Sequence, residues 1–336
     1  MRPLALGPNQ LHRFYRGGRR IAALRRVARG DEYAPEEWIG STTTVFGSDE
    51  LGLARLPDGR TLRDAIAADP EAYLGEAHVR RFGPDPALLV KLLDAGQRLP
   101  IHFHPGREFA AVHLGSPYGK TEAWVIVESD AAAQVWVGFR EDVGADVVAA
   151  WVEHQDAESM LAGLNRLPVS VGDTVFVPGG TPHAIGEGIL MVELQEPTDF
   201  SVLLEWRGFA LDGAAEGHLG LGFDRALAAL DRRAWTREDL DRVREVRGGG
   251  QPGLERLFPS EAEEFFRGER IGCDGHVALE AAFSIVVVTE GEGALVPDAG
   301  APLPLGRGDA VLVPFAAGAC RIEGSVEAIR CLPPTA

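Results

Sequence analysis

The run from Gly172 to His183, GDTVFVPGGTPH, constrains the fold of this chain more than any other feature. Its opening Gly-Asp predicts a tight turn, the next residues to Val177 predict a strand, and Pro178-Gly179-Gly180 ends that strand before the histidine. A histidine pair, His102-Phe103-His104, lies upstream. Alternate side chains of a strand share one face, so these two imidazoles point the same way. Three imidazoles that converge from two strands, together with a carboxylate, favour a divalent metal site inside a β-barrel.

Composition narrows the class of protein. The chain has 336 residues, with 33 Lys+Arg against 50 Asp+Glu and a formal charge of -17, which argues against nucleic acid or an anionic membrane as a partner. Its three cysteines have no Cys-x-x-Cys spacing, so neither a disulfide framework nor a thiolate metal site is indicated. No apolar run reaches spanning length and the first residues do not resemble a signal peptide, so we expect a cytoplasmic protein.

The pattern of elements predicts a mainly β protein in four parts. We expect an N-terminal mixed segment (1–87) that contributes to a first barrel, a metal-binding barrel (88–206), a helical insert (207–255) and a C-terminal metal-free barrel (256–336). Within the first part, residues 13–15 and 37–45 read as strands, and Thr61 with Asp64 three residues later indicates a helix start. Helices are expected over 145–164 and 223–230.

The final part repeats the turn and strand of the metal-binding part. The pattern Gly-Asp-x-Val-x-Val-Pro occurs at Gly172 to Pro178 and again at Gly308 to Pro314. No histidine follows Pro314 at the position that corresponds to His183, and His276 has no partner in this part of the sequence. We therefore interpret the C-terminal barrel as a structural copy without a metal.

These motifs together resemble type I mannose-6-phosphate isomerases, which are zinc-dependent cupins with a helical portion. The resemblance covers most of the chain and is carried by five stretches: residues 88–93, 102–105, 119–124 (Gly-Lys-Thr-Glu-Ala-Trp), 178–186 and 192–195. It implies an RmlC-like cupin fold with two jelly-roll barrels. It also implies a metal-dependent aldose–ketose isomerase of the mannose-6-phosphate/fructose-6-phosphate type, acting on a sugar phosphate. We expect a monomer or homodimer.

The resemblance implies one Zn²⁺ per chain, with another divalent metal as the alternative, held by His104, Glu122 and His183. The glutamine ligand of the family falls on His102, and imidazole is the better donor, so metal binding should survive this change. The general cupin pattern would place the carboxylate at Glu108 instead. We favour Glu122, because on a strand it shares a face with Trp124 and can point toward the histidines.

Three charged residues are candidates for catalysis. Lys91 and Glu193 interrupt apolar runs, so each needs a partner or a polar lumen to face. A structural ion pair would explain them equally well on residue chemistry alone. The resemblance places Lys91, Lys120 and Glu193 along the substrate cleft, where Lys120 with the metal would be the electrophile and Glu193 the base.

One departure from the family pattern bears on the substrate. The family has an arginine four residues after the aspartate of its Gln-x-x-x-Asp stretch, and here Leu203 follows Asp199 at that spacing. Arg207 is the alternative source of a cation. This change leaves two other interpretations open: an isomerase of an unphosphorylated sugar and a non-catalytic or regulatory sugar-binding cupin. The third histidine in place of the family glutamine also leaves a metal-dependent oxygenase open.

Overall fold

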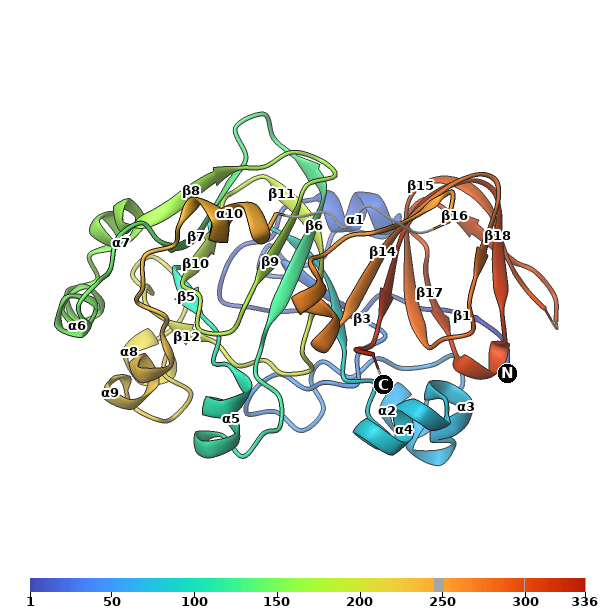
Figure 1. Ribbon diagram of the computed structural model, residues 1–336, viewed down its shortest axis with the longest axis horizontal. Helices are drawn as coiled ribbons and strands as arrows, with labels where there is room; N and C mark the ends of the chain where they lie inside the picture. The colour runs from blue at the N-terminus through green and yellow to red at the C-terminus, as the bar shows by residue number, and fades with distance from the viewer. Residues whose placement is uncertain (245–250, 299, 336) are drawn as a thin grey trace.

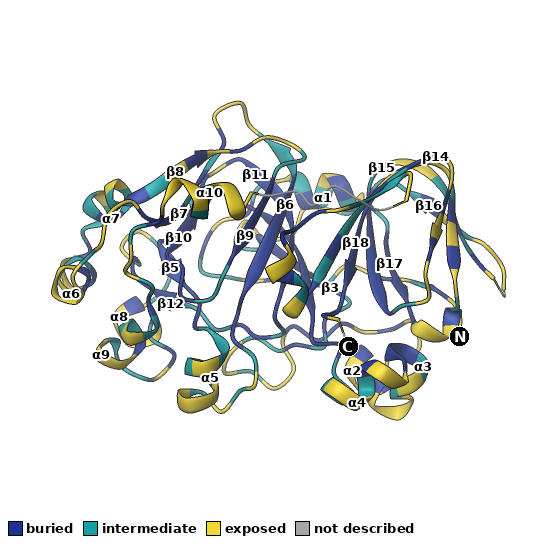
Figure 2. Cartoon of the chain, viewed as in Figure 1, coloured by how far each residue is buried: buried dark blue, intermediate teal, exposed yellow. Residues whose placement is uncertain are grey.

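The computed structural model describes residues 1–244, 251–298 and 300–335, and it is built mainly from antiparallel strands arranged in three sheets. Figure 1 shows two of these sheets forming the barrel on the left of the view and the third curling into a barrel on the right. Most strands are buried, whereas most helices lie at the surface (Figure 2). No helix among the described residues is long and apolar enough to cross a membrane.

The left barrel, which we call the histidine barrel, consists of a six-stranded and a five-stranded sheet whose inner faces share one hydrophobic core. The six-stranded sheet has the order β2 (Gln10–Leu11), β3 (Glu36–Ile39), β4 (Leu89–Asp94), β11 (Ile189–Gln195), β6 (Glu122–Ser129) and β9 (Thr174–Val177). The five-stranded sheet has the order β12 (Val202–Leu203), β5 (His102–Phe103), β10 (His183–Ile185), β7 (Gln134–Phe139) and β8 (Leu164–Pro168).

Strand register brings charged residues into transverse rows on the inner face of the six-stranded sheet. Glu193 on β11 lies opposite Lys91 on β4 and opposite Trp124 on β6. One row further along β11, Gln195 lies opposite Glu122. Because residues two apart on a strand share a face, Lys91, Glu193 and Glu122 all face the same interior.

The right barrel, which we call the C-terminal barrel, is a single seven-stranded sheet. Its order is β1 (Leu4–Ala5), β17 (Ala310–Val313), β15 (Ser284–Pro297), β18 (Cys320–Leu332), β14 (Arg267–Leu279) and β13 (Leu254–Arg256), with β16 (Leu303–Gly306) paired to β15. Alternation along β15 divides its side chains: Val286 and Val288 pack inside this barrel, while Ile285 and Val287 join the core shared with the histidine barrel. The two barrels are therefore fused through one apolar layer.

The N-terminal segment is divided between the two barrels. β2 and β3 extend the histidine barrel as expected, but β1 pairs with β17 of the C-terminal barrel, so this segment does not serve the first barrel alone. Helix α1 (Arg20–Arg25) follows, and α2 (Leu62–Ala68), α3 (Pro70–Leu74) and α4 (Glu76–Phe82) gather below the C-terminal barrel in Figure 1. The Thr61 cap is confirmed, since its side chain accepts from the Asp64 amide at 3.0 Å.

Three local predictions are wrong in extent. Residues 13–15 form no strand: residue 13 is irregular and residues 14 and 15 form a bend. The strand expected over 37–45 is β3 and stops at Ile39, because Gly40 takes a positive φ of 56° that turns the chain. The helix expected over 145–164 is two helices, α6 (Ala145–His154) and α7 (Ala157–Gly163), separated at Gln155, which also has a left-handed φ of 53°.

The remaining helices are short. α5 (Arg107–His113) follows the histidine pair, and the predicted helical insert contains α8 (Gly213–Glu216), α9 (Phe223–Ala226), η1 (Leu227–Ala229) and α10 (Arg237–Arg242). Two further 3₁₀ turns are η2 (Ser260–Glu264) and η3 (Phe315–Ala317). Residues 245–250 of the insert lie outside the described residues, and the domain boundaries stay a prediction.

Candidate functional site

Three histidines meet inside the histidine barrel. His102 on β5 lies directly opposite His183 on β10, and His104 follows β5 on the same face. One nitrogen from each ring can be chosen so that the three atoms lie within 4.8 Å of one another, and all three residues are buried. Among the described residues this is the group of side chains that could hold a metal ion. The convergence predicted from the two motifs is therefore present.

Backbone carbonyls fix the orientation of each imidazole. Nδ1 lies 2.8 Å from the Pro100 oxygen in His102, 2.7 Å from the Phe200 oxygen in His104 and 2.9 Å from the Thr181 oxygen in His183. A carbonyl only accepts, so each Nδ1 donates and each Nε2 keeps its lone pair for the shared centre. His183 Nε2 is buried with no hydrogen-bond partner. Such an orphaned nitrogen fits a metal ligand.

Burial favours the neutral form of His102 and His104, which is the form that binds metal. Desolvation, with Lys120 and the neighbouring rings, lowers the pKa of His104 to about 3. Desolvation and the other two histidines hold the pKa of His102 well below its usual range. Ring centroids of His102 and His183 are only 4.2 Å apart, so protonation of either would place a cation against the other.

Glu122 is the carboxylate beside the histidines. Its Oε2 lies 3.0 Å from His104 Nε2 and its Oε1 lies 3.4 Å from His183 Nε2. Burial opposes its ionisation, but Lys120 and His104 hold its pKa well below the usual range. Glu108, the alternative, is exposed on α5. The structure thus brings Glu122 and not Glu108 to the histidine cluster.

Lys120 lies between the histidine cluster and Glu193. Its Nζ is 2.7 Å from both His104 Nε2 and Glu122 Oε2, and 3.8 Å from Glu193 Oε1. A metal on His104 would take the lone pair that Lys120 uses here and leave the amine facing the two carboxylates. This arrangement places a buried cation within reach of anything bound to the centre.

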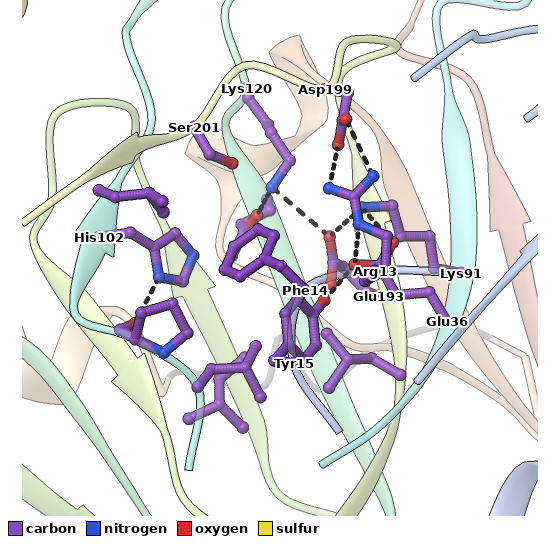
Figure 3. Close-up of a pocket in the computed structure, with 16 residues that line it drawn as sticks. Arg13, Phe14, Tyr15, Glu36, Lys91, His102, Lys120, Glu193, Asp199 and Ser201 are labelled. Atoms are coloured by element: carbon purple, nitrogen blue, oxygen red, sulfur yellow. Dashed lines mark hydrogen bonds and ion pairs between the residues drawn. The ribbon is translucent and has the colours of Figure 1, made fainter. Parts of the chain in front are cut away.

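Lys91 and Glu193 form the next part of the same pocket, as Figure 3 shows. Lys91 Nζ lies 3.5 Å from Glu193 Oε1 and 5.0 Å from the centre of the Trp38 ring. Burial is the main cause that raises the pKa of Glu193, with Glu122 adding to it against the pull of Lys91. A glutamate with a raised pKa is a stronger base than a solvated one.

Four polar residues of the pocket escaped the sequence analysis as site residues: Arg13, Tyr15, Glu36 and Ser201. Glu36 accepts from the Tyr15 hydroxyl and from Trp38 Nε1 at 2.6 Å, and lies 3.4 Å from Lys91 Nζ. Asp199, seen in the sequence only as a motif marker, holds both terminal nitrogens of Arg13 at 3.2 Å. For Arg13, the sequence offered one signal: a charged residue in a short stretch, 13–15, that was otherwise predicted to be a strand.

Leu203 lies inside the pocket, whereas Arg207 lies outside it. Leu203 lies on β12 opposite His102 and lines the pocket, so the position considered for the family arginine is inside the site. Its correspondence to that arginine stays a prediction. Arg207 is exposed and donates to the His154 carbonyl at 3.1 Å. The alternative in which Arg207 supplies the missing cation is therefore wrong; Arg13 is the guanidinium in this pocket.

Comparison with curated proteins finds similarity to mannose-6-phosphate isomerases. No model of a known protein family matches the chain. It is 29% identical over 248 residues to mannose-6-phosphate isomerase ManA of Bacillus subtilis (strain 168), covering 72% of this chain and 73% of that protein. It is 34% identical over 197 residues to the probable mannose-6-phosphate isomerase GmuF of the same organism, covering 59% of each chain. The chain is thus similar to mannose-6-phosphate isomerases over most of its length.

Solved structures of this family agree with the fold. The mannose 6-phosphate isomerase of Bacillus subtilis superposes with a TM-score of 0.78 at 22% identity, over 98% of this chain and 99% of that chain. A variant of phosphomannose isomerase from Salmonella typhimurium gives a TM-score of 0.75 at 16% identity, over the full length of both chains. The predicted mainly β cupin fold is confirmed.

Proposed function

We propose that this protein is a metal-dependent aldose–ketose isomerase acting on a sugar phosphate of the mannose 6-phosphate and fructose 6-phosphate type. The observation that carries the proposal is the buried meeting of three imidazoles with Lys120, Glu122 and Glu193 in one pocket. The similarity to mannose-6-phosphate isomerases supports the same reaction. It favours an isomerase over a non-catalytic sugar-binding cupin, an isomerase of an unphosphorylated sugar or an oxygenase.

His102, His104, His183 and Glu122 would hold the metal. Three neutral imidazoles and one carboxylate form a donor set typical of zinc, and the orphaned His183 Nε2 supports this fit. Bound there, the ion would supply Lewis-acid polarisation of the oxygens on C1 and C2 of the sugar. Elemental analysis of the purified protein should find about one zinc per chain.

Glu193 moves the proton in this proposal. Isomerisation takes the proton from C2 of the open-chain aldose and returns it to C1, while the hydroxyl proton passes from the C2 oxygen to the C1 oxygen. Glu193 accepts and returns the carbon proton, and its raised pKa makes it a stronger base than a solvated glutamate. Lys91, 3.5 Å away, orients the carboxylate and binds a sugar hydroxyl.

Lys120 acts on the oxygens. Its ammonium donates to the sugar oxygen that gains negative charge when the carbon proton leaves, and its contact with Glu122 at 2.7 Å holds it in place. Arg13 closes the opposite side, where its Nε lies 3.3 Å from Glu36 Oε1 and its two terminal nitrogens bind Asp199.

A coupled assay tests the proposal directly. Zinc-loaded protein is expected to convert mannose 6-phosphate to fructose 6-phosphate, to lose this activity after chelation and to regain it when zinc is restored. Absence of turnover on mannose 6-phosphate and on a panel of other aldose phosphates would contradict it. The chain's charge of -17 still predicts no nucleic acid partner, and a cytoplasmic location and a monomer or homodimer stay predictions.

A further inference from the structure

The cations of the metal pocket are already engaged by carboxylates. Lys120 contacts Glu122 at 2.7 Å, Lys91 contacts Glu193 at 3.5 Å, and both terminal nitrogens of Arg13 bind Asp199. Glu36 adds a fourth buried carboxylate beside Lys91 and Arg13. A phosphoryl group that entered this pocket would compete with four carboxylates for three cations. The phosphorylated end of a substrate therefore needs another binding place.

A second pocket adjoins the first at Asp199, which lines both. Its walls come from the loop after β3, the first turn of α2 and the stretch before β12. Hydroxyl groups dominate its polar lining, with one guanidinium: Thr42, Thr43, Thr44, Ser116 and Arg63. We call this pocket the threonine pocket.

Two groups in the threonine pocket are free to bind a ligand. The Thr43 hydroxyl oxygen is buried and has no hydrogen-bond partner, and the residue as a whole is 8% exposed. Arg63 is exposed, and its side chain makes no ion pair or hydrogen bond with the part of the chain that the structure describes. A hydroxyl donor and an unpaired guanidinium are the groups that bind phosphate oxygens.

The two carboxylates that also line the threonine pocket are occupied. Asp199 is held by the Arg13 fork and accepts from the Phe46 amide at 3.3 Å. Asp85 accepts from the Ala87 amide at 2.8 Å, and burial raises its pKa. Asp199 is thus neutralised by Arg13, and one oxygen of Asp85 is taken by a backbone amide.

We propose that the threonine pocket is the phosphoryl-binding subsite of the substrate. Arg63 pairs with two phosphate oxygens, and Thr43, with its neighbours Thr42 and Thr44, donates hydroxyl hydrogen bonds. The sugar chain passes beside the Arg13–Asp199 pair and reaches the histidine cluster with its C1–C2 end. This subsite rests on the proposed function for its substrate, but its affinity for a phosphoryl group can be measured without turnover.

The test compares three variants of the zinc-loaded protein. Arg63→Leu removes the free cation, Thr43→Val removes the buried hydroxyl at nearly constant volume, and Arg60→Leu is the control. Arg60 lies three residues before Arg63, is exposed, pairs with Asp58 at 2.7 Å and does not line the pocket. KM and kcat for mannose 6-phosphate are measured, together with the Kd for inorganic phosphate by calorimetry.

Arg63→Leu should raise KM for mannose 6-phosphate and Kd for phosphate by about tenfold or more, with kcat little changed. Thr43→Val should raise both several-fold, and Arg60→Leu should match the wild type. Wild-type values in both pocket variants would overturn the subsite, as would phosphate binding to the metal alone, which Arg63→Leu would leave intact. If the wild type isomerises no sugar phosphate but Arg63→Leu still weakens phosphate binding, the proposed function fails and the subsite stands.

Discussion

The histidine barrel and the C-terminal barrel contain the same type of turn, but their interiors differ. Gly172 and Gly308 both take positive φ, at 90° and 86°. The following aspartate accepts from the amide three residues before it, at 2.9 Å in Asp173 and 2.8 Å in Asp309. The shared Gly-Asp-x-Val-x-Val-Pro pattern thus specifies the turn and the strand that follows it, which is β9 in one barrel and β17 in the other.

The difference lies in what each strand faces. After Pro178 the chain leads through a second proline to His183 and β10, whereas after Pro314 it enters η3 and β18. The C-terminal barrel is filled by aliphatic side chains such as Val286, Val311 and Ile322. Its buried cation, Arg330, is satisfied by Glu269 at 3.1 Å and by the Glu280 carbonyl at 2.8 Å. A repeated framework therefore carries chemistry only where its interior is polar and open to a pocket.

The largest effect should follow from removing a ligand of the histidine barrel. His104→Ala and His183→Ala are each expected to lose the metal and with it the isomerase activity, because the remaining donors no longer enclose an ion. His276→Ala, at an exposed position of the C-terminal barrel, is the matched control and should keep both. Full metal content in both ligand variants, measured by elemental analysis, would refute the assignment.

Changes to the proton-transfer groups should cost activity without costing metal. Glu193→Gln and Lys120→Met are expected to lower kcat by a factor on the order of 10² or more while zinc stays bound. Glu327→Gln, exposed on β18, is the control and should behave as the wild type. The measurement is steady-state kinetics with parallel metal analysis, and a wild-type rate in either pocket variant would remove that residue from the mechanism.

Core truncation in the C-terminal barrel should affect stability and spare the chemistry. Leu312 is fully buried in the layer that joins the two barrels, so Leu312→Ala should lower the free energy of unfolding by about 2–5 kcal/mol. Denaturant titration measures this loss. Metal content and kcat below the unfolding transition should stay at wild-type values; a fall in metal content of the folded protein would show that the C-terminal barrel is not merely structural.

The two turn glycines should respond unequally to the same substitution. A Cβ at Gly308 would lie 1.7 Å from the Leu24 carbonyl oxygen, whereas at Gly172 its nearest neighbour is the end of the Arg270 side chain at 3.7 Å. Both alanines carry the strain of positive φ, about 1–2 kcal/mol, but only Gly308→Ala also collides with backbone. Denaturant titration should find Gly308→Ala clearly less stable than Gly172→Ala, and equal stabilities would contradict the close packing of α1 on this turn.

Local sequence signals predicted the parts of the molecule that local physics determines. The Thr61 cap, the two Gly-Asp turns and the alternation of His102 with His104 follow from neighbouring residues. Arg13 could not be placed this way, because its partner Asp199 is 186 residues away in the sequence. The same holds for β1, a two-residue strand whose pairing with β17 depends on the assembled barrel. Which carboxylate reaches the histidines was also a tertiary question, decided by the register of β6 against β11.

Zinc-edge anomalous diffraction from crystals of the purified protein would locate the metal. We expect one strong peak per chain in the histidine barrel, about 2.0–2.2 Å from Nε2 of His102, His104 and His183 and from an oxygen of Glu122. We expect none inside the C-terminal barrel. A peak held by other residues, or no peak at the three histidines in zinc-loaded protein, would contradict the proposed metal site.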